Sequence, residues 1–226
     1  MRPKTLDHVA LWVADRDAIT DFLIERLSMH VIERTDRFTL VGTDARRGKL
    51  TLFAEEGPRE QGALKHVALR VNDLATALAG LEGIEVDREN GSAYFDVHEG
   101  LRLGLVEAQT DVEYDLDHVA LFSASPEETA RQYQQFGFAP NNEGRVEVGG
   151  AFVEFHEGDP GDPERPLLNH LAVLVDSAEE TLQEAERAGF EVADVVDAPN
   201  TYAIFVWGPE HVKIEYVEQK PTFALK

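Results

Sequence analysis

A short apolar segment with a histidine at its third position occurs four times in this chain. The hexamer LDHVAL stands at residues 6–11 and again at 116–121, and the related hexamers LKHVAL and LNHLAV stand at 64–69 and 168–173. Self-similarity at a period of 52 to 58 residues indicates copies of one supersecondary unit, each too small to bury its own hydrophobic face. The repeat therefore constrains the fold more than any other feature of the sequence.

Each hexamer opens a segment that reads as one strand, one helix and three further strands. Apolar spacing near 3.6 predicts the helices, and β-branched and aromatic residues in period-2 alternation predict the strands. Ser125 and Ser177 are expected to cap the last two helices, and Gly137 and Gly189 to end them in the left-handed conformation. The four predicted helices cover residues 17–28, 74–81, 125–137 and 177–189.

The four βαβββ modules are expected to pair, because one module alone leaves a sheet face uncovered. The connector at residues 108–115 divides the chain into two nearly equal halves, and sequential elements usually lie side by side. We therefore predict an N-terminal half at residues 1–110, made of modules one and two, and a C-terminal half at residues 111–226, made of modules three and four. The alternative pairs module one with module four and module two with module three.

Alternation along a strand places each histidine on the same face as the residue two positions later. That residue is alanine in all four modules: Ala10, Ala68, Ala120 and Ala172. A small side chain beside an imidazole leaves the open volume that a ligand site needs and that a close-packed core avoids. The histidines are therefore candidates for a binding site.

Carboxylates accompany the histidines only in the last two modules. Glu154 and Glu215 lie in the closing strands of those modules between apolar residues, where a carboxylate is costly unless it is paired or binds a metal. Thr51 and Gly104 stand at the corresponding positions of modules one and two. The chain has no cysteine, so any metal would be held by nitrogen and oxygen ligands.

We predict one metal site, in the C-terminal half. The N-terminal half is expected to be metal-free, with the ring nitrogens of His8 and His66 hydrogen-bonded inside it. The alternative module pairing would instead give two sites of two histidines and one glutamate each: His8, His170 and Glu215, and His66, His118 and Glu154. The four predicted metal ligands are His118, Glu154, His170 and Glu215.

The acidic composition limits the partners that this chain can have. It carries 43 Asp and Glu against 21 Lys and Arg, a formal net charge of −22, which repels the phosphates of nucleic acids. No apolar run approaches the roughly 18 residues of a membrane span, and no signal segment opens the sequence, so we expect a cytoplasmic protein without a membrane partner. Dispersed acid with only 6 Lys against 15 Arg resembles the surfaces of proteins from salt-loving organisms.

The four βαβββ units, the HVAL or HLAV segment that opens each, and the IEYVE that closes the last resemble the vicinal oxygen chelate superfamily. This group includes glyoxalase I, extradiol ring-cleaving dioxygenases, methylmalonyl-CoA epimerase and bleomycin-resistance proteins. The resemblance covers nearly the whole chain and implies an α+β fold in which paired modules form two half-open mixed β-barrels. It also implies one divalent metal ion (Fe, Mn, Zn, Ni or Co) and a small-molecule substrate that chelates it through neighbouring oxygens.

The resemblance leaves three functions open. A carboxylate that can leave the metal can move a proton, so Glu154, with His156 on the same strand face, is the expected acid–base pair of a glyoxalase- or isomerase-type reaction. A ring-cleaving dioxygenase is the alternative, but Phe205 stands where those enzymes have a tyrosine, and their acid–base histidine has no counterpart in register. A metal-free binding protein is the third function, against which the retained ligands count. The sequence does not decide whether the chain forms a homo-oligomer.

Overall fold

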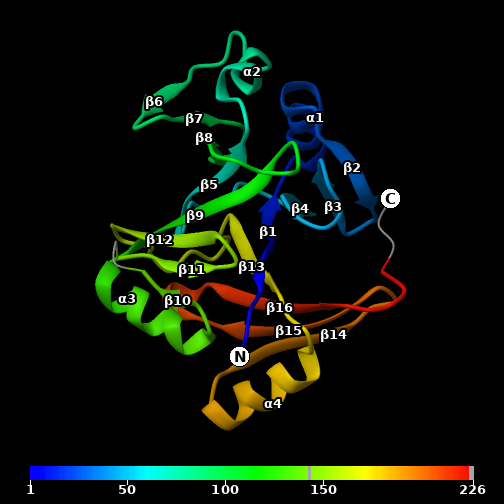
Figure 1. The fold of residues 1–226 in the computed structure, drawn as a ribbon, viewed down its shortest axis with the longest axis vertical. Coiled ribbons are helices and arrows are strands. Elements are labelled where there is room, and N and C mark those ends of the chain that lie inside the picture. Colours follow the sequence, from blue (N-terminus) through cyan, green and yellow to red (C-terminus); the bar gives the residue numbers. More distant parts are fainter. Residues whose placement is uncertain (142–143, 224–226) are drawn as a thin grey trace.

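The computed structural model describes residues 1–141 and 144–223, which form two eight-stranded mixed sheets and four α-helices (Figure 1). Helices α1 and α2 lie at one end of the molecule, and α3 and α4 lie at the other. No helix in the described residues is long and apolar enough to cross a membrane. The predicted class, α+β with βαβββ modules in two half-open mixed barrels, is confirmed.

The first sheet combines modules one and four in the strand order β14-β15-β16-β13-β1-β4-β3-β2. Module one consists of β1 (Thr5–Val13), α1 (Arg16–Leu27), β2 (His30–Arg34), β3 (Phe38–Gly42) and β4 (Lys49–Ala54). Module four consists of β13 (Leu168–Leu174), α4 (Ala178–Ala188), β14 (Val192–Asp197), β15 (Thr201–Trp207), the short 3-10 helix η2 (Pro209–His211) and β16 (Lys213–Gln219).

The second sheet combines modules two and three in the order β10-β11-β12-β9-β5-β8-β7-β6. Module two consists of β5 (Leu64–Val71), α2 (Leu74–Ala79), β6 (Asp87–Glu89), β7 (Ser92–Asp96) and β8 (Arg102–Glu107). Module three consists of β9 (Asp115–Ser123), α3 (Pro126–Tyr133), the 3-10 helix η1 (Gln134–Phe136), β10 (Ala139–Pro140), β11 (Val146–Val148) and β12 (Ala151–Glu157).

The predicted pairing of modules one with two and three with four is wrong, and the alternative pairing is the one that forms. The short connector at 108–114 keeps modules two and three in one sheet, so sequential neighbours do pair there. The connectors at 55–63 and 158–167 instead cross between the sheets, and they run side by side. Glu60 N donates to Arg165 O, and Leu167 N donates to Glu60 O, both at 2.8 Å.

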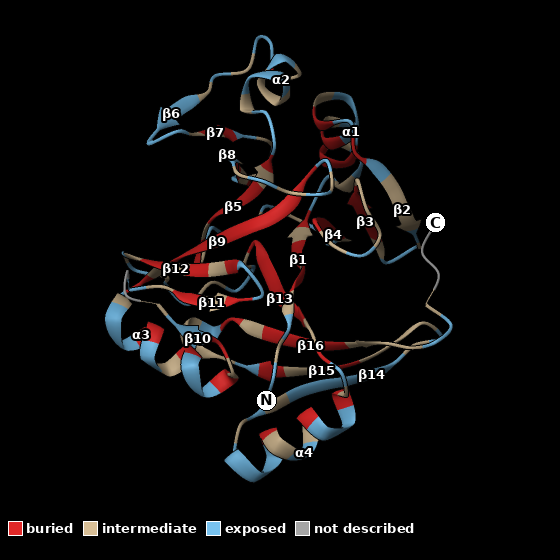
Figure 2. Cartoon of the chain, in the orientation of Figure 1, coloured by how far each residue is buried: buried red, intermediate tan, exposed pale blue. Residues whose placement is uncertain are grey.

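The two modules of each half lie in different sheets and meet through side chains. Phe22 of α1 stacks on Phe95 of β7 with ring centroids 6.1 Å apart, and Phe136 of η1 stacks on Phe190, which follows α4, at 4.5 Å. One hydrophobic core contains residues of both sheets, and Figure 2 shows the first strands as largely buried. Neither 1–110 nor 111–226 contains a whole sheet, because each half supplies one module to each.

The predicted helix ends are mostly confirmed. Ser177 Oγ accepts from Glu180 N at 3.1 Å, and Gly137 and Gly189 have φ angles of 93° and 76°, in the left-handed region. Ser125 differs, because its side chain caps nothing; Pro126 follows it at the first helical position. There the helix begins with the backbone bond from Thr129 N to Ser125 O instead.

Candidate metal centres

The pairing of first strands brings the histidines together two by two. In the antiparallel pair β1–β13, His8 lies opposite Ala172, and His170 lies opposite Ala10. The pair β5–β9 repeats this register with the other two histidines and alanines. Because the residue opposite each ring is small, both imidazoles of a sheet can turn toward one centre. Each alanine therefore leaves room both for the histidine of its own strand and for the histidine of the neighbouring strand.

His8, His170 and Glu215 form the first of two groups, which we call the cavity site. His8 Nε2 lies 3.2 Å from His170 Nε2, and Glu215 Oε2 lies 3.1 Å from the first nitrogen and 2.9 Å from the second. Glu215 reaches this centre from β16, where it pairs with Ala172 of the parallel neighbour β13. Thr51 occupies the matching position on β4, paired with Ala10.

His66, His118 and Glu154 form the other group, which we call the second cluster. His66 Nε2 and His118 Nε2 are 3.0 Å apart, and Glu154 Oε1 lies 3.8 and 3.7 Å from them. These two groups are the sets of three ligand-type side chains that converge among the described residues. They match the alternative ligand sets given by the sequence.

The predicted four-ligand site does not form. His118 and Glu154 lie in the second sheet, whereas His170 and Glu215 lie in the first, because modules three and four do not share a sheet. His8, which we expected to be structural, instead points its Nε2 at the ligand atoms of module four. The cavity site thus takes its ligands from modules one and four, and the second cluster takes its ligands from modules two and three.

Acceptors on the far side of both rings fix the tautomers at the cavity site. His8 Nδ1–H donates to Asp7 Oδ2 at 2.8 Å, and His170 Nδ1–H donates to Asn169 Oδ1 at 3.1 Å. Asp7 is held in turn by the buried Lys49, whose Nζ lies 2.9 and 3.1 Å from its two oxygens. Both Nε2 atoms therefore point to one centre beside Glu215, where a bound cation would take the place of a proton.

The cavity site attracts positive charge. Burial alone would lower the pKa of His8, but the carboxylates of Glu215 and Asp7 outweigh it and raise this pKa to about 9. Burial alone would raise the pKa of Glu215, but the charges of His170 and His8 hold it well below its usual value. Glu215 Oε2 is buried and accepts no hydrogen bond from any described residue. These residues fit a divalent metal ion, which favours two imidazoles and one carboxylate.

The second cluster satisfies its polar atoms without a cation. His156 Nε2–H donates to Glu154 Oε1 at 2.7 Å, and Lys65 Nζ donates to His156 Nδ1 at 3.0 Å. The tautomer of His66 that carries its proton on Nε2 can donate to His118 Nε2. Burial is the main reason that the pKa of His66 falls to about 3, so this ring stays neutral.

The cavity that gives the first site its name has a volume of about 630 Å³. The three ligand side chains and Thr51 line it together with six aromatic rings: Trp12, Phe38, Phe53, Phe205, Trp207 and Phe223. Phe205 packs edge-on against His170 with centroids 5.1 Å apart. Such a pocket, apolar with a few convergent polar groups, suits a small molecule.

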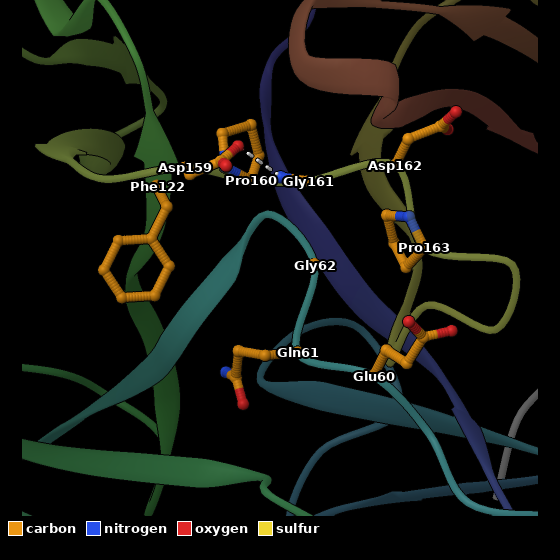
Figure 3. Close-up of a pocket in the computed structure, with 9 residues that line it drawn as sticks. All are labelled: Glu60, Gln61, Gly62, Phe122, Asp159, Pro160, Gly161, Asp162 and Pro163. Atoms are coloured by element: carbon orange, nitrogen blue, oxygen red, sulfur yellow. Dashed lines mark hydrogen bonds between the residues drawn. The ribbon is translucent and has the colours of Figure 1, made fainter.

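A smaller cavity of about 340 Å³ lies between the two crossing connectors (Figure 3). Three carboxylates line it, but Figure 3 shows that they do not point to a common centre. Asp159 Oδ1 accepts from Gly161 N, and Glu60 Oε1 accepts from Arg165 N, so both brace the connectors. This cavity has no converging ligand set among the described residues.

Four residues of the cavity site were missed from the sequence: Asp7, Lys49, Asn169 and Lys213. A signal for the first was present, because both copies of LDHVAL place an aspartate directly before the histidine. Asp117 repeats the contact in the second cluster, accepting from His118 Nδ1–H at 2.7 Å. Alternation places Lys213 on the strand face of Glu215, but no spacing rule points to Lys49, whose role depends on strand register.

Comparison with known proteins agrees with this architecture. Residues 5–102 match the family model described as the Glyoxalase/Bleomycin resistance protein/Dioxygenase superfamily. No curated protein sequence matches the chain significantly. The family match covers modules one and two, and over the whole chain the likeness to solved structures is one of fold, in line with the resemblance that the sequence predicts.

Three solved structures illustrate the shared fold. A proposed dioxygenase from Bacillus subtilis is 18% identical, with 97% of this chain and 86% of that chain covered and a TM-score of 0.78. Glyoxalase I from Zea mays is 15% identical, with 95% and 92% covered and a TM-score of 0.73. The cppA protein from Streptococcus pneumoniae is 14% identical, with 96% and 100% covered and a TM-score of 0.63. At these identities the likeness concerns the fold.

Proposed function

We propose that this protein is a mononuclear divalent-metal enzyme whose ligands are His8, His170 and Glu215, and whose small substrate chelates the ion through two neighbouring oxygens. The observation that carries this proposal is the buried Glu215 oxygen, which accepts no hydrogen bond from the described residues and faces two imidazole nitrogens at the floor of a cavity. A bound divalent ion would supply Lewis acidity, which stabilises an enolate- or catecholate-like anion.

The residues around the ligands have separate tasks. Asp7 and Asn169 hold the two rings so that Nε2 faces the centre, and Lys49 keeps Asp7 ionised and in place. Phe205 packs against His170 and excludes water from that side of the site. Thr51 also lines the cavity, and its hydroxyl cannot serve as a carboxylate base.

The donor set favours oxygenase chemistry. The expectation of proton transfer relied on Glu154 and His156 acting beside Glu215, but these two residues lie in the other sheet. Two histidines and one carboxylate are the ligands of many Fe(II) oxygenases. The fold likeness to a proposed dioxygenase from Bacillus subtilis supports the same reaction class. We therefore place an extradiol-type dioxygenase first.

Proton transfer of the glyoxalase or isomerase type is the second candidate. Glu215 is the carboxylate that faces the two imidazole Nε2 atoms of the cavity site, so it is the group that would exchange a proton with a substrate. The fold likeness to glyoxalase I from Zea mays supports this class. A metal-free binding protein is less well supported, because such a protein has no need of three converging ligands.

Metal content and oxygen uptake test the proposal. The protein purified without chelator should hold about one equivalent of metal, which the Glu215→Ala and His170→Ala variants lose. The His118→Ala variant is the matched control and should keep it. Iron with oxygen uptake on catechols supports the dioxygenase; zinc, nickel, manganese or cobalt without oxygen uptake supports proton transfer. Metal that is lost in His118→Ala but kept in Glu215→Ala would assign the function to the second cluster.

A further inference from the structure

Both tryptophans of the chain line the cavity, and they flank one lysine. Lys213 Nζ lies 6.0 Å from the ring centroid of Trp12 and 5.6 Å from that of Trp207. The two rings come from β1 and from the end of β15, so modules one and four both contribute to this contact. At these distances an aromatic face attracts an ammonium but does not neutralise it.

Strand register places this ammonium next to the cavity site. Lys213 is two residues before Glu215 on β16, and alternation puts both side chains on the cavity face. On the neighbouring strands Lys213 pairs with His170 of β13 and with Trp207 of β15. A molecule that reached the ligands could therefore reach the ammonium at the same time.

Lys213 differs from the other lysines that the structure describes. Lys4, Lys49 and Lys220 each form an ion pair with an aspartate, and Lys65 donates to His156. Lys213 forms no ion pair or hydrogen bond with any described residue, although it is half-buried in a chain with a net charge of −22. Asp194 also lines the cavity and attracts Lys213, but it forms no ion pair with it, so the ammonium can still take a partner from a molecule in the cavity.

The geometry points to a substrate that carries a carboxylate, and we infer that Lys213, flanked by Trp12 and Trp207, binds it. The substrate is then a small acid with a flat apolar body, the carboxylate at one end and the chelating oxygens at the other. The chelating end rests on the proposed function, whereas the acidic end depends on Lys213; Arg37 and Lys49 also line the cavity, but Lys49 is paired with Asp7. A single ammonium matches a singly charged carboxylate, and the aromatic walls match the apolar body.

Tryptophan fluorescence reports on this cavity, because both tryptophans line it. Benzoate and its neutral analogue benzamide are titrated into the purified protein, and again into the Glu215→Gln variant, in which the metal site is disabled. We expect benzoate to bind about tenfold more tightly or better in both proteins, the effect of one charge-assisted hydrogen bond. In Lys213→Met this ratio should fall to about one, whereas Lys213→Arg should retain it.

Lys4→Met is the matched control, because it removes an exposed lysine outside the cavity, and its ratio should equal that of the parent. A ratio near one in the parent, or a ratio that persists in Lys213→Met, would overturn the inference. A second pair, 3,4-dihydroxybenzoate and catechol, separates the two proposals. If catechol binding does not depend on Glu215 but the benzoate ratio still depends on Lys213, the metal site fails and the carboxylate site stands.

Discussion

The cavity site and the second cluster share a local sequence but hold their third ligand differently. Each contains one copy of LDHVAL, and in each the aspartate holds the histidine by Nδ1. The glutamate oxygen lies 2.9 to 3.1 Å from the imidazole nitrogens in the cavity site and 3.7 to 3.8 Å away in the second cluster. The pKa of His8 is raised to about 9, whereas that of His66, which belongs to the LKHVAL copy, is lowered to about 3. The position of the third ligand therefore separates two groups that contain the same hexamer.

Neighbours of the third ligand explain the difference. His156 engages Glu154 by a hydrogen bond, and the Glu154 side chain is 27% exposed, against 9% for Glu215. Gly104 stands in the second cluster where Thr51 stands in the cavity site. The ring of Tyr94 packs closely over Gly104 and contacts the ring of His66 at a centroid distance of 4.8 Å. The second cluster is thus filled by its own side chains.

The largest expected effect is a difference in metal affinity between variants of the two glutamates. Glu215→Gln should lower the affinity for a divalent metal by about 100-fold or more, since an anionic ligand is lost from a buried site. Glu154→Gln is the matched change in the second cluster and should leave the stoichiometry near one. Isothermal titration with Zn²⁺ or Fe²⁺ measures both. Equal losses in the two variants would contradict the comparison.

The two aspartates of the LDHVAL copies should also differ, by a smaller amount. Asp7→Asn weakens the acceptor that orients His8 and leaves Lys49 without its carboxylate, so metal affinity should fall about 10- to 100-fold. Asp117→Asn should not change that affinity, although it removes the partner of Arg70. The same titration serves, and a loss in Asp117→Asn alone would reverse the assignment.

Gly104→Ala should change stability without changing metal binding. A Cβ at this position would lie 2.7 Å from Tyr94 Cε1, so the ring must move, at a cost of about 1–3 kcal/mol in the free energy of unfolding. Urea unfolding measures the loss, and the metal content should stay that of the parent. In a Tyr94→Ala background the further loss on Gly104→Ala should largely disappear. If it does not, the close packing of Tyr94 is not its cause.

Salt should screen the charges on the surface more than the buried charges of either site. The net charge of −22 repels itself, so the free energy of unfolding should rise by about 1 kcal/mol or more from low to molar KCl. The pair of Asp7 with Lys49 is buried and should be screened little. Urea unfolding across this salt range tests the resemblance to proteins of salt-loving organisms. No gain in stability would refute it.

The repeat was enough to predict four βαβββ modules, because each copy carries its own strand and helix signals. The pairing of modules was not predictable from spacing, since it depends on how the connectors at 55–63 and 158–167 cross. His8 was misjudged for the same reason: its module lacks a carboxylate, and its partner Glu215 belongs to the last module. The carboxylates themselves were found from the cost of burying them between apolar residues.

Because module four pairs with module one, the two groups of ligand-type side chains form at different stages of folding. His66 and His118 are 52 residues apart, so the second cluster can assemble while the chain is still being synthesised. His8 and His170 are 162 residues apart, and Glu215 lies in the final strand. Non-local contacts of this kind form late and slowly. The site proposed to be active can therefore form only after the strand that carries Glu215 has been made, and a nascent fragment that ends before this strand lacks the third ligand.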